Sequence, residues 1–453
     1  MSHSHDVPAR RNFLKLSARL AALGITSLGL EPARGFFARE VHAQRGVTDY
    51  KALVCVYMFG GNDSNNLIVP ADNYSAYSAA RGGTGGVALA ANTLLPIPGP
   101  GGTTYGLHPS LTELAPIYNA GYLACVLNMG ALNRPLTKQQ YQSGASRPPN
   151  LFSHSDQTTQ AQTGSSTQHT GWGGRLLDLF GATDSLSAVS VSSPAVFLDG
   201  NDVRSNVIPP GANLGIYGMN FWPPSAADAR RQAVNAMILM DGGNPIREAA
   251  NGMFANGLQL ADTLQASGGL PPTTSPFPTT SLGNQMREVA RLIRVRAQMG
   301  PGRQVFFCST GGFDTHSSQM GTHANLLRDL SQSLSAFAYA TLDLGLAGNV
   351  TTFTQSEFNR TTQTNGTGTD HAWGGHHIVL GGAVQGGIYG SMPDFVLGGD
   401  QDTSNRGVWI PTIGSVQFGA TLGRWFGATP GELVWAFPNL SNFPTGDIGF
   451  MRA

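Results

Sequence analysis

The segment ALVCVYMFGGNDSNN (52–66) joins an unbroken apolar run to a polar cluster through two glycines. Eight consecutive apolar residues are typical of a strand buried on both faces, as the strands of parallel sheets are. Short apolar runs bounded by glycine, asparagine or serine recur along the chain and predict further strands. Together with the first run (52–59), the predicted strands cover 122–129, 186–192, 303–310, 349–355 and 377–384.

Helical periodicity appears between some of these runs. The segments 286–299 and 324–342 place apolar residues, beginning with Met286 and Leu327, at the spacing of one helix face. Strands that alternate with helices over this length predict an α/β fold, with a mostly parallel central sheet and helices on both faces. In such sheets, ligands bind beyond the carboxyl ends of the strands.

The N-terminal region is expected to be an export signal and not part of the fold. Arg10 and Arg11 precede a weakly apolar run, and small residues suited to cleavage follow at Ala43. This pattern predicts a twin-arginine (Tat) signal at 1–43 and a periplasmic or secreted protein. An amphipathic N-terminal helix is the alternative. No apolar run reaches the roughly 18 residues that a membrane span needs, so no transmembrane segment is predicted.

The remainder, 44–453, is expected to form a single α/β domain. Gly/Pro/Thr-rich segments at 82–106 and 266–283 predict surface loops or insertions. Removing six of 27 basic and three of 27 acidic residues with the signal leaves 21 against 24, which gives no reason to expect a nucleic-acid partner. Three cysteines lie inside apolar runs and are expected to be buried free thiols, not a disulfide framework.

Polar residues follow several predicted strands closely. Asp63 comes after the first strand, and the segment GGFDTH places Asp314 and His316 after the strand 303–310. The next strand is followed by SEFNR, and TDHAWGGHH (369–377) holds three of the eight histidines that lie beyond the signal. Strand ends converge at one edge of a parallel sheet, and Asp, Glu and His bind Zn²⁺ or Mn²⁺, with Ca²⁺ or Mg²⁺ as oxygen-rich alternatives.

Each of these residues has an ordinary structural explanation as well. An aspartate after two glycines is often a turn or cap residue, and His323 at the start of a helical pattern is expected to be structural. His376 and His377 adjoin a strand, so their side chains should point to opposite faces, and His377 is the expected extra metal ligand with His376 as its alternative. The metal hypothesis therefore depends on several clusters that recur after strands.

The twin-arginine segment, GGND, GGFDTH, SEFNR and DHAWGGHHIVLGGAVQGGIYG together resemble a secreted bacterial family, domain of unknown function (DUF) 1501. The resemblance runs from about residue 45 to the C-terminus. It implies the fold of the alkaline phosphatase and sulfatase superfamily and, by analogy, two divalent metals that flank a nucleophile. It brings no assigned substrate.

The resemblance implies a set of metal ligands position by position. Asp63 matches the opening ligand, and Asp314 and His316 match a later pair that the superfamily usually spaces more widely. Glu357-Phe358 stands where Asp-His is usual, so one carboxylate is kept and the histidine is lost. Asp370-His371 then matches a late histidine. A second register equates Asp370-His371 with the missing Asp-His pair itself.

The nucleophile position departs most from the superfamily pattern. Counting ten residues back from Gly164, where the resemblance implies serine, threonine or cysteine, arrives at His154, flanked by Ser153 and Ser155. His154 could be a phosphorylated nucleophile or a metal ligand, a flanking serine could act instead, or the chemistry could be altered or lost. Arg360 (or Arg175) could clamp an anionic oxygen, or serve an ordinary structural role.

These observations favour an exported metal-dependent hydrolase of small anionic phosphate or sulfate esters, with zinc as the first metal to consider. The alternative is a secreted binding or assembly protein on a degenerate phosphatase-like fold, for which a protein partner would be expected. A metal-dependent enzyme that acts on other substrates is a third possibility. The expected metal ligands are Asp63, Asp314, His316, Glu357, Asp370, His371 and His377, and the expected catalytic residues are Ser153, His154, Ser155 and Arg360.

Overall fold

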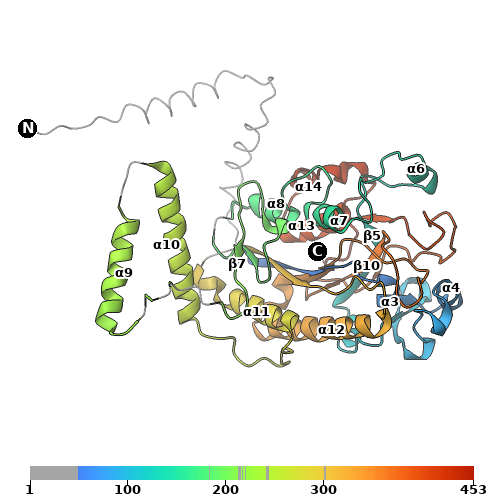
Figure 1. The fold of residues 1–453 in the computed structure, drawn as a ribbon, viewed down its shortest axis with the longest axis horizontal. Helices are drawn as coiled ribbons and strands as arrows, with labels where there is room; N and C mark the ends of the chain where they lie inside the picture. The colour runs from blue at the N-terminus through green and yellow to red at the C-terminus, as the bar shows by residue number, and fades with distance from the viewer. Residues whose placement is uncertain are drawn as a thin grey trace, which may run out of the picture. The chain divides into compact units, whose positions relative to one another are not determined.

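A large sheet forms the centre of the fold in the computed structural model (Figure 1). The structure describes residues 49–452 except 183, 213–215, 217, 220, 241–243, 300 and 301. The expected export signal at 1–43 lies outside the described residues, and residues Val47–Ala453 form one compact unit.

The sheet is parallel apart from one strand. Its order is β11 (Gly387–Tyr389), β5 (Leu123–Gly130), β10 (Gly375–Leu380), β9 (Val350–Gln355), β1 (Lys51–Met58), β8 (Arg303–Thr310), β6 (Ala188–Ser190) and β7 (Asn206–Val207), with β12 (Ile413–Gly414) beside β5. Within the described part of the chain, only β10 runs antiparallel to its neighbours in this sheet. All six segments predicted as strands contribute to it, which confirms a mixed α/β fold with a large, mostly parallel sheet.

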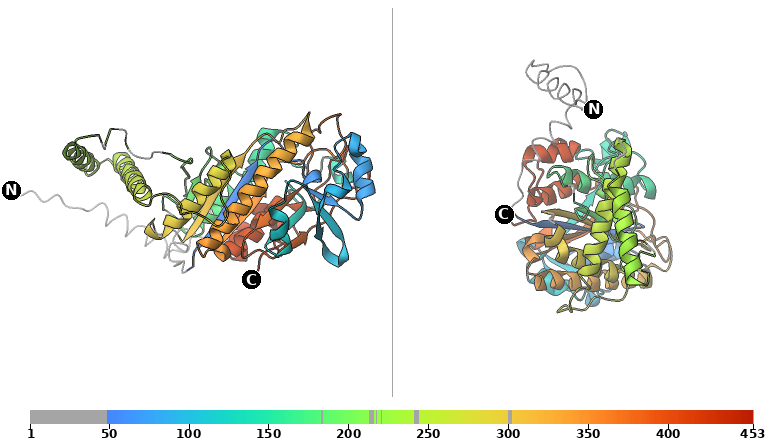
Figure 2. Two further views of the ribbon diagram at one scale, coloured as in Figure 1. Left: turned by 90° about the horizontal axis from the view of Figure 1, so that it is seen from below. Right: turned by 90° about the vertical axis from the view of Figure 1, so that its left-hand side faces the viewer.

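Both faces of the sheet are buried beneath helices. In β1, Leu53, Cys55 and Tyr57 pack into one core and Val54 and Val56 into the other, all without solvent exposure. This explains the unbroken apolar run, because both sets of alternating side chains leave water. The first face carries α7 (His154–Thr163), α8 (Trp172–Asp178), α13 (Ser415–Phe426) and α14 (Pro430–Ala436), and the second carries α5 (Leu114–Asn119), α11 (Ser281–Met299) and α12 (Gln319–Asp343) (Figures 1 and 2).

The prediction of a surface loop at 82–106 is wrong in part. This segment contains β3 (Leu95–Pro98) and β4 (Thr104–Leu107), which pair with β2 (Ile68–Pro70) in a small antiparallel sheet. In β3, Ile97 is buried between the exposed Pro96 and Pro98, and this period of two is hard to see in a segment so rich in glycine and proline. Residues 267–280 form the predicted loop between α10 and α11.

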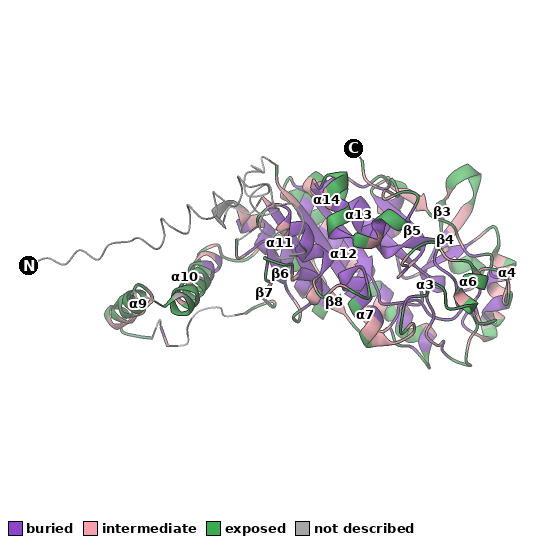
Figure 3. Ribbon diagram, turned by 90° about the horizontal axis from the view of Figure 1, so that it is seen from above, coloured by how far each residue is buried: buried purple, intermediate pink, exposed green. Residues whose placement is uncertain are grey.

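Two helices that the periodicity did not predict, α9 (Pro224–Ile238) and α10 (Pro245–Ala266), lie side by side at one end of the described unit (Figures 1 and 3). The three cysteines are buried and free, as expected. Among the described residues, none of the helices combines the length and apolar character needed to cross a membrane. The remaining described α-helices are α3 (Ser64–Leu67), α4 (Tyr74–Ala80) and α6 (Lys138–Gln142).

Candidate metal centre

Four side chains from separate parts of the chain converge beyond the carboxyl ends of the parallel strands. His154 is the first residue of α7, Asp314 and His316 follow β8, and His371 precedes β10. Because β10 is antiparallel, its start lies at the same edge of the sheet as the ends of β8 and β9. Open α/β sheets bind their ligands at this edge.

The donor atoms of these residues lie close together. Asp314 Oδ1 is 3.0 Å from His316 Nε2 and 3.2 Å from His371 Nε2, and Asp314 Oδ2 is 3.5 Å from His154 Nε2. The Nε2 atoms of His316 and His371 are themselves 3.1 Å apart. Donor atoms of His154, Asp314 and His371 all lie within 4.8 Å of one another. All four side chains remain partly open to solvent.

Each histidine is fixed by its other ring nitrogen. His371 Nδ1 is 2.9 Å from the carbonyl oxygen of Phe152, His154 Nδ1 is 2.9 Å from Glu357 Oε1, and His316 Nδ1 is 3.1 Å from Asp370 Oδ1. A carbonyl or carboxylate oxygen accepts hydrogen bonds, so each Nδ1 carries the proton and donates. With Nδ1 protonated, the neutral form of each imidazole carries its lone pair on Nε2, the atom that faces Asp314. Metal-binding histidines are held in this way by oxygen acceptors behind them.

The arrangement fits a divalent metal ion. Zinc bonds of about 2.0–2.1 Å at tetrahedral angles place neighbouring ligand atoms roughly 3.3–3.4 Å apart. The separations of 3.0–3.5 Å around Asp314 are close to that value. In addition, His154 Nε2 is buried and makes no hydrogen bond within the described part of the chain. Positive charge between the two neighbouring Nε2 atoms and the carboxylate stabilises this arrangement, and a metal ion or a shared proton can supply it.

Arg360 positions Asp314 and is not free to clamp a ligand. Its side chain is fully buried, and its guanidinium donates to Asp314 Oδ1 at 2.6 Å and to the carbonyl oxygens of Gly60 and Thr369. Burial alone would raise the pKa of Asp314, but the hydrogen bond and charge of Arg360 outweigh it, so this pKa lies below its usual value. Burial also lowers the pKa of His371, which favours the neutral imidazole that binds metal.

Phe358 occupies the position where the resemblance implies a histidine. Its ring centroid lies 4.8 Å from that of His154 and 4.7 Å from that of His371. The buried phenyl ring of Phe358 is therefore a packing contact for two of the converging imidazoles, His154 and His371.

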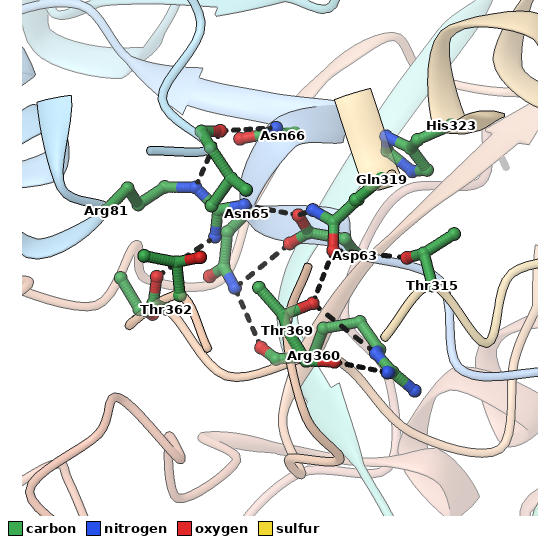
Figure 4. A network of polar contacts seen from close by, with 12 residues as sticks. Asp63, Asn65, Asn66, Arg81, Thr315, Gln319, His323, Arg360, Thr362 and Thr369 are labelled. Atoms are coloured by element: carbon green, nitrogen blue, oxygen red, sulfur yellow. Dashed lines mark hydrogen bonds and ion pairs between the residues drawn. The ribbon is translucent and has the colours of Figure 1, made fainter. Parts of the chain in front are cut away.

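The structure does not bring Asp63 into this group. Asp63 is fully buried, and its carboxylate accepts hydrogen bonds from Arg81, Gln319 and Asn65 (Figure 4). Its oxygens are thus occupied by protein donors. The Gln319 side chain also accepts a hydrogen bond from Thr369, whose hydroxyl and carbonyl oxygens accept from Arg360. Asp63 is therefore connected to the candidate centre only through a buried polar network.

Glu357 and Asp370 lie behind the converging atoms. Glu357 Oε1 accepts from the backbone N–H of Gly60 at 2.7 Å as well as from His154. Asp370 accepts from Asn365 and pairs with Arg406 at 2.7 Å. Burial opposes ionisation of Asp370, but these contacts and His316 bring its pKa down to about 2. Both carboxylates are placed to orient histidines.

His376 and His377 point to opposite faces of β10, as the strand alternation predicts. His376 Nδ1 accepts from the backbone N–H of Asn128, whereas His377 packs near Phe418. Burial lowers the pKa of His376 to about 3 and that of His377 to about 4. Among the described residues, the group whose donor atoms all lie within 4.8 Å of one another is His154, Asp314 and His371. Neither His376 nor His377 belongs to it, and His316 adjoins it through its contacts with Asp314 and His371.

Of the two serines that flank His154, Ser153 caps helix α7 and Ser155 lies in its first turn. The Ser153 hydroxyl accepts from the backbone N–H of Asp156 and donates to its carboxylate at 2.6 Å, and Ser155 Oγ lies 3.2 Å from Ser153 Oγ. Such a cap satisfies the free N–H groups at a helix start. Arg175 is buried and donates to three carbonyl oxygens, so it too is structural.

Comparison with protein families shows which family the chain belongs to. The family model described as "Protein of unknown function (DUF1501)" matches residues 50–406. The chain belongs to the DUF1501 family. No curated protein gave a match. The matched region of this DUF1501 protein includes all four converging residues and every carboxylate behind them.

Some residues of the centre could not be found from sequence patterns. The Phe152 carbonyl oxygen orients His371, and Phe152 adopts a left-handed backbone conformation with φ of 73°. Bulky residues rarely adopt this conformation, and such strain is common at functional sites. Asn365 and Arg406, which support Asp370, also lie in loops without a recognisable pattern.

Proposed function

We propose that this DUF1501 protein is an exported, metal-dependent hydrolase of small phosphate or sulfate esters, with an alkaline phosphatase/sulfatase-like fold. His154, Asp314, His316 and His371 would hold a divalent metal, with zinc as the best match to the donor set. The observation that carries the proposal is that the Nε2 atoms of three imidazoles, each held through its Nδ1 by an oxygen acceptor, converge on one carboxylate.

The chain's own residues supply binding and orientation. A metal held there would polarise an ester oxygen and stabilise the charge that develops during transfer. The start of α7, with its exposed Ser155 and the positive end of the helix dipole, favours an anionic ester beside the centre. Glu357, Asp370 and the Phe152 carbonyl hold the three imidazoles in place. Since Ser153 is engaged as a cap, water is a better candidate nucleophile than this hydroxyl.

A second candidate is a non-catalytic binding or assembly protein of the periplasm or cell exterior. The observation that favours it is that His154, at the expected nucleophile position, has Nδ1 engaged with Glu357 and Nε2 directed at Asp314. Such a protein would still bind metal but would not turn over esters.

Hydrolysis assays on the purified, zinc-loaded chain test the proposal. Aryl phosphate and aryl sulfate esters serve as substrates, and His316→Ala is compared with His169→Ala, which changes an exposed histidine outside the cluster. The expected result is hydrolysis of one ester class, with kcat/KM lowered roughly 100-fold or more only in His316→Ala. Metal-loaded protein that hydrolyses neither class would reject the hydrolase and favour the second candidate. Equal activity in both variants would show that the cluster takes no part in catalysis.

A further inference from the structure

The helices α9 and α10, together with Trp222 before them, form a two-helix arm whose surface is mostly exposed (Figure 3). Local sequence supports both helices: Pro224 starts α9, and the Asn244 side chain caps α10 by accepting from the backbone N–H groups of Ile246 and Arg247. Yet α9 has no buried residue. A helix of this length is marginal in water unless an apolar face packs against something.

The arm presents large apolar side chains to solvent. Seven are exposed to between 46% and 86%, namely Trp222, Met237, Leu239, Met240, Ile246, Met253 and Phe254. A large or aromatic side chain offers roughly 150–250 Å² when fully exposed, so these seven offer on the order of 1,000 Å². The largest apolar patch on a typical monomer is about 300–600 Å². A standard protein interface buries about 800 Å² on each partner, so the arm has enough surface for one.

Several apolar positions recur at helical spacing. On α10, Ile246 and Met253 are seven residues apart, and on α9, Ala229, Ala233 and Met237 are each four residues apart and exposed. Such spacing produces the apolar stripes through which helices pack into bundles. At the other end of α10, Leu260 and Leu264 are buried in the main core, so the arm is anchored there.

The charges of the arm favour a partner with the same composition. Among its described residues, three arginines stand against three acidic residues, namely Arg230, Arg231, Arg247, Asp228, Glu248 and Asp262. Arg231 and Asp262 already pair at 2.7 Å. A basic excess would attract an anionic lipid surface, and this balanced set lacks one. In a two-fold interface, a patch with balanced charges and apolar stripes can pair with itself.

We propose that the arm binds a second copy of this chain, and that the two arms pack as a four-helix bundle. Each copy contributes α9 and α10, which lie side by side in one chain. The exposed apolar side chains of both copies form the bundle core, and the paired arginines and acids remain at its rim. The interface is distant in sequence from the candidate metal centre and independent of the proposed function.

Light scattering and sedimentation of the purified full chain test this inference. The variant Ile246→Glu/Met253→Glu places charges on the α10 stripe while keeping helix-forming residues. Leu342→Glu, a change at an exposed leucine of α12, is the matched control. We expect a particle of twice the chain mass for the wild type and the control. The double variant should dissociate, with a dimer dissociation constant raised roughly 100-fold or more.

Circular dichroism and thermal unfolding establish that the double variant stays folded, and Met253→Glu alone provides a milder second variant. A monomeric wild type at micromolar concentrations would overturn the inference. So would a dimer that persists in both folded arm variants, because another surface would then hold it. If the wild type is monomeric and floats with lipid vesicles, and the arm variants do not float, the arm binds a membrane surface and not a second copy.

Discussion

Asp63 and Asp314 occupy equivalent places after neighbouring parallel strands, β1 and β8, but their surroundings differ completely. Asp63 is fully buried, and its carboxylate is occupied by Arg81, Gln319 and Asn65. The Asp314 side chain is 43% exposed and lies beside three imidazoles with only Arg360 behind it. The comparison teaches that a carboxylate at a strand end is a metal ligand only if its protein neighbours leave an oxygen available.

The two regions should therefore fail in different ways. Removing one partner of a buried ion pair destabilises the fold strongly, because the other charge remains in a poorly solvated site. Removing a partly exposed imidazole of the candidate centre, such as His316, leaves no buried charge unpaired, so it costs less folding energy and more ligand affinity. The following experiments separate these two kinds of loss.

The largest effect is expected from Asp63→Ala. This change leaves the fully buried Arg81 without its carboxylate, and it should lower the free energy of unfolding by about 3–5 kcal/mol. Chemical denaturation in the presence of chelator measures the loss. His316→Ala under the same conditions is the control, because it removes a partly exposed side chain of the candidate centre, and it should lose clearly less. Equal losses for the two variants would contradict the distinction between the regions.

A smaller effect is expected behind the histidines. Asp370→Ala and Glu357→Ala remove the acceptors of His316 and His154, and each should weaken zinc binding about 10–100-fold without removing a ligand. Competition with a zinc-binding dye measures the affinity. Asp343→Ala, at an exposed carboxylate at the end of α12, should have no effect. Unchanged affinity in both test variants would show that these carboxylates do not orient metal ligands.

The last prediction concerns pH and involves buried histidines outside the centre. Burial lowers the pKa of His108, His323 and His376 to about 3 and that of His377 to about 4, from an ordinary 6.5. The unfolded chain therefore binds more protons than the folded chain between about pH 4 and 6.5, and stability should rise with pH across this window. Each histidine contributes at most about 1.4 kcal/mol per pH unit.

Denaturation of chelated protein at several pH values measures this slope, and His377→Gln should reduce it. A flat profile between pH 4 and 6.5 would mean that these histidines are solvated or paired in the folded protein. Because chelator is present throughout, metal release does not contribute to the result.

Much of the fold could be predicted because its signals are local. The apolar runs of β1, β5 and β8 are buried on both faces, and α12 follows the expected periodicity. The β3–β4 hairpin was missed because its alternation is hidden among prolines and glycines. The arm was missed because most of its apolar residues, apart from the end of α10, do not face the core of their own chain, so the usual pattern of a core-facing helix is absent.

The candidate site was only partly predictable. Asp314, His316 and His371 were expected from their places after or before strands, and His154 from the resemblance, by counting back from Gly164. Whether Asp63 is free to bind a metal depends on Arg81 from the end of α4 and Gln319 from α12, and no spacing in the sequence encodes that contact. The same holds for the Phe152 carbonyl oxygen, which is a backbone atom brought to His371 across the fold.

Metal content, measured by mass spectrometry on protein purified without chelator, tests the central claim most directly. Wild type and His371→Ala should be compared with His169→Ala as the control, since that histidine is exposed and outside the cluster. The account predicts at least one zinc or similar divalent ion per chain in the wild type and the control, and loss of that ion in a folded His371→Ala protein. A folded wild type that neither contains nor takes up a divalent metal, or a His371→Ala variant with full occupancy, would contradict it.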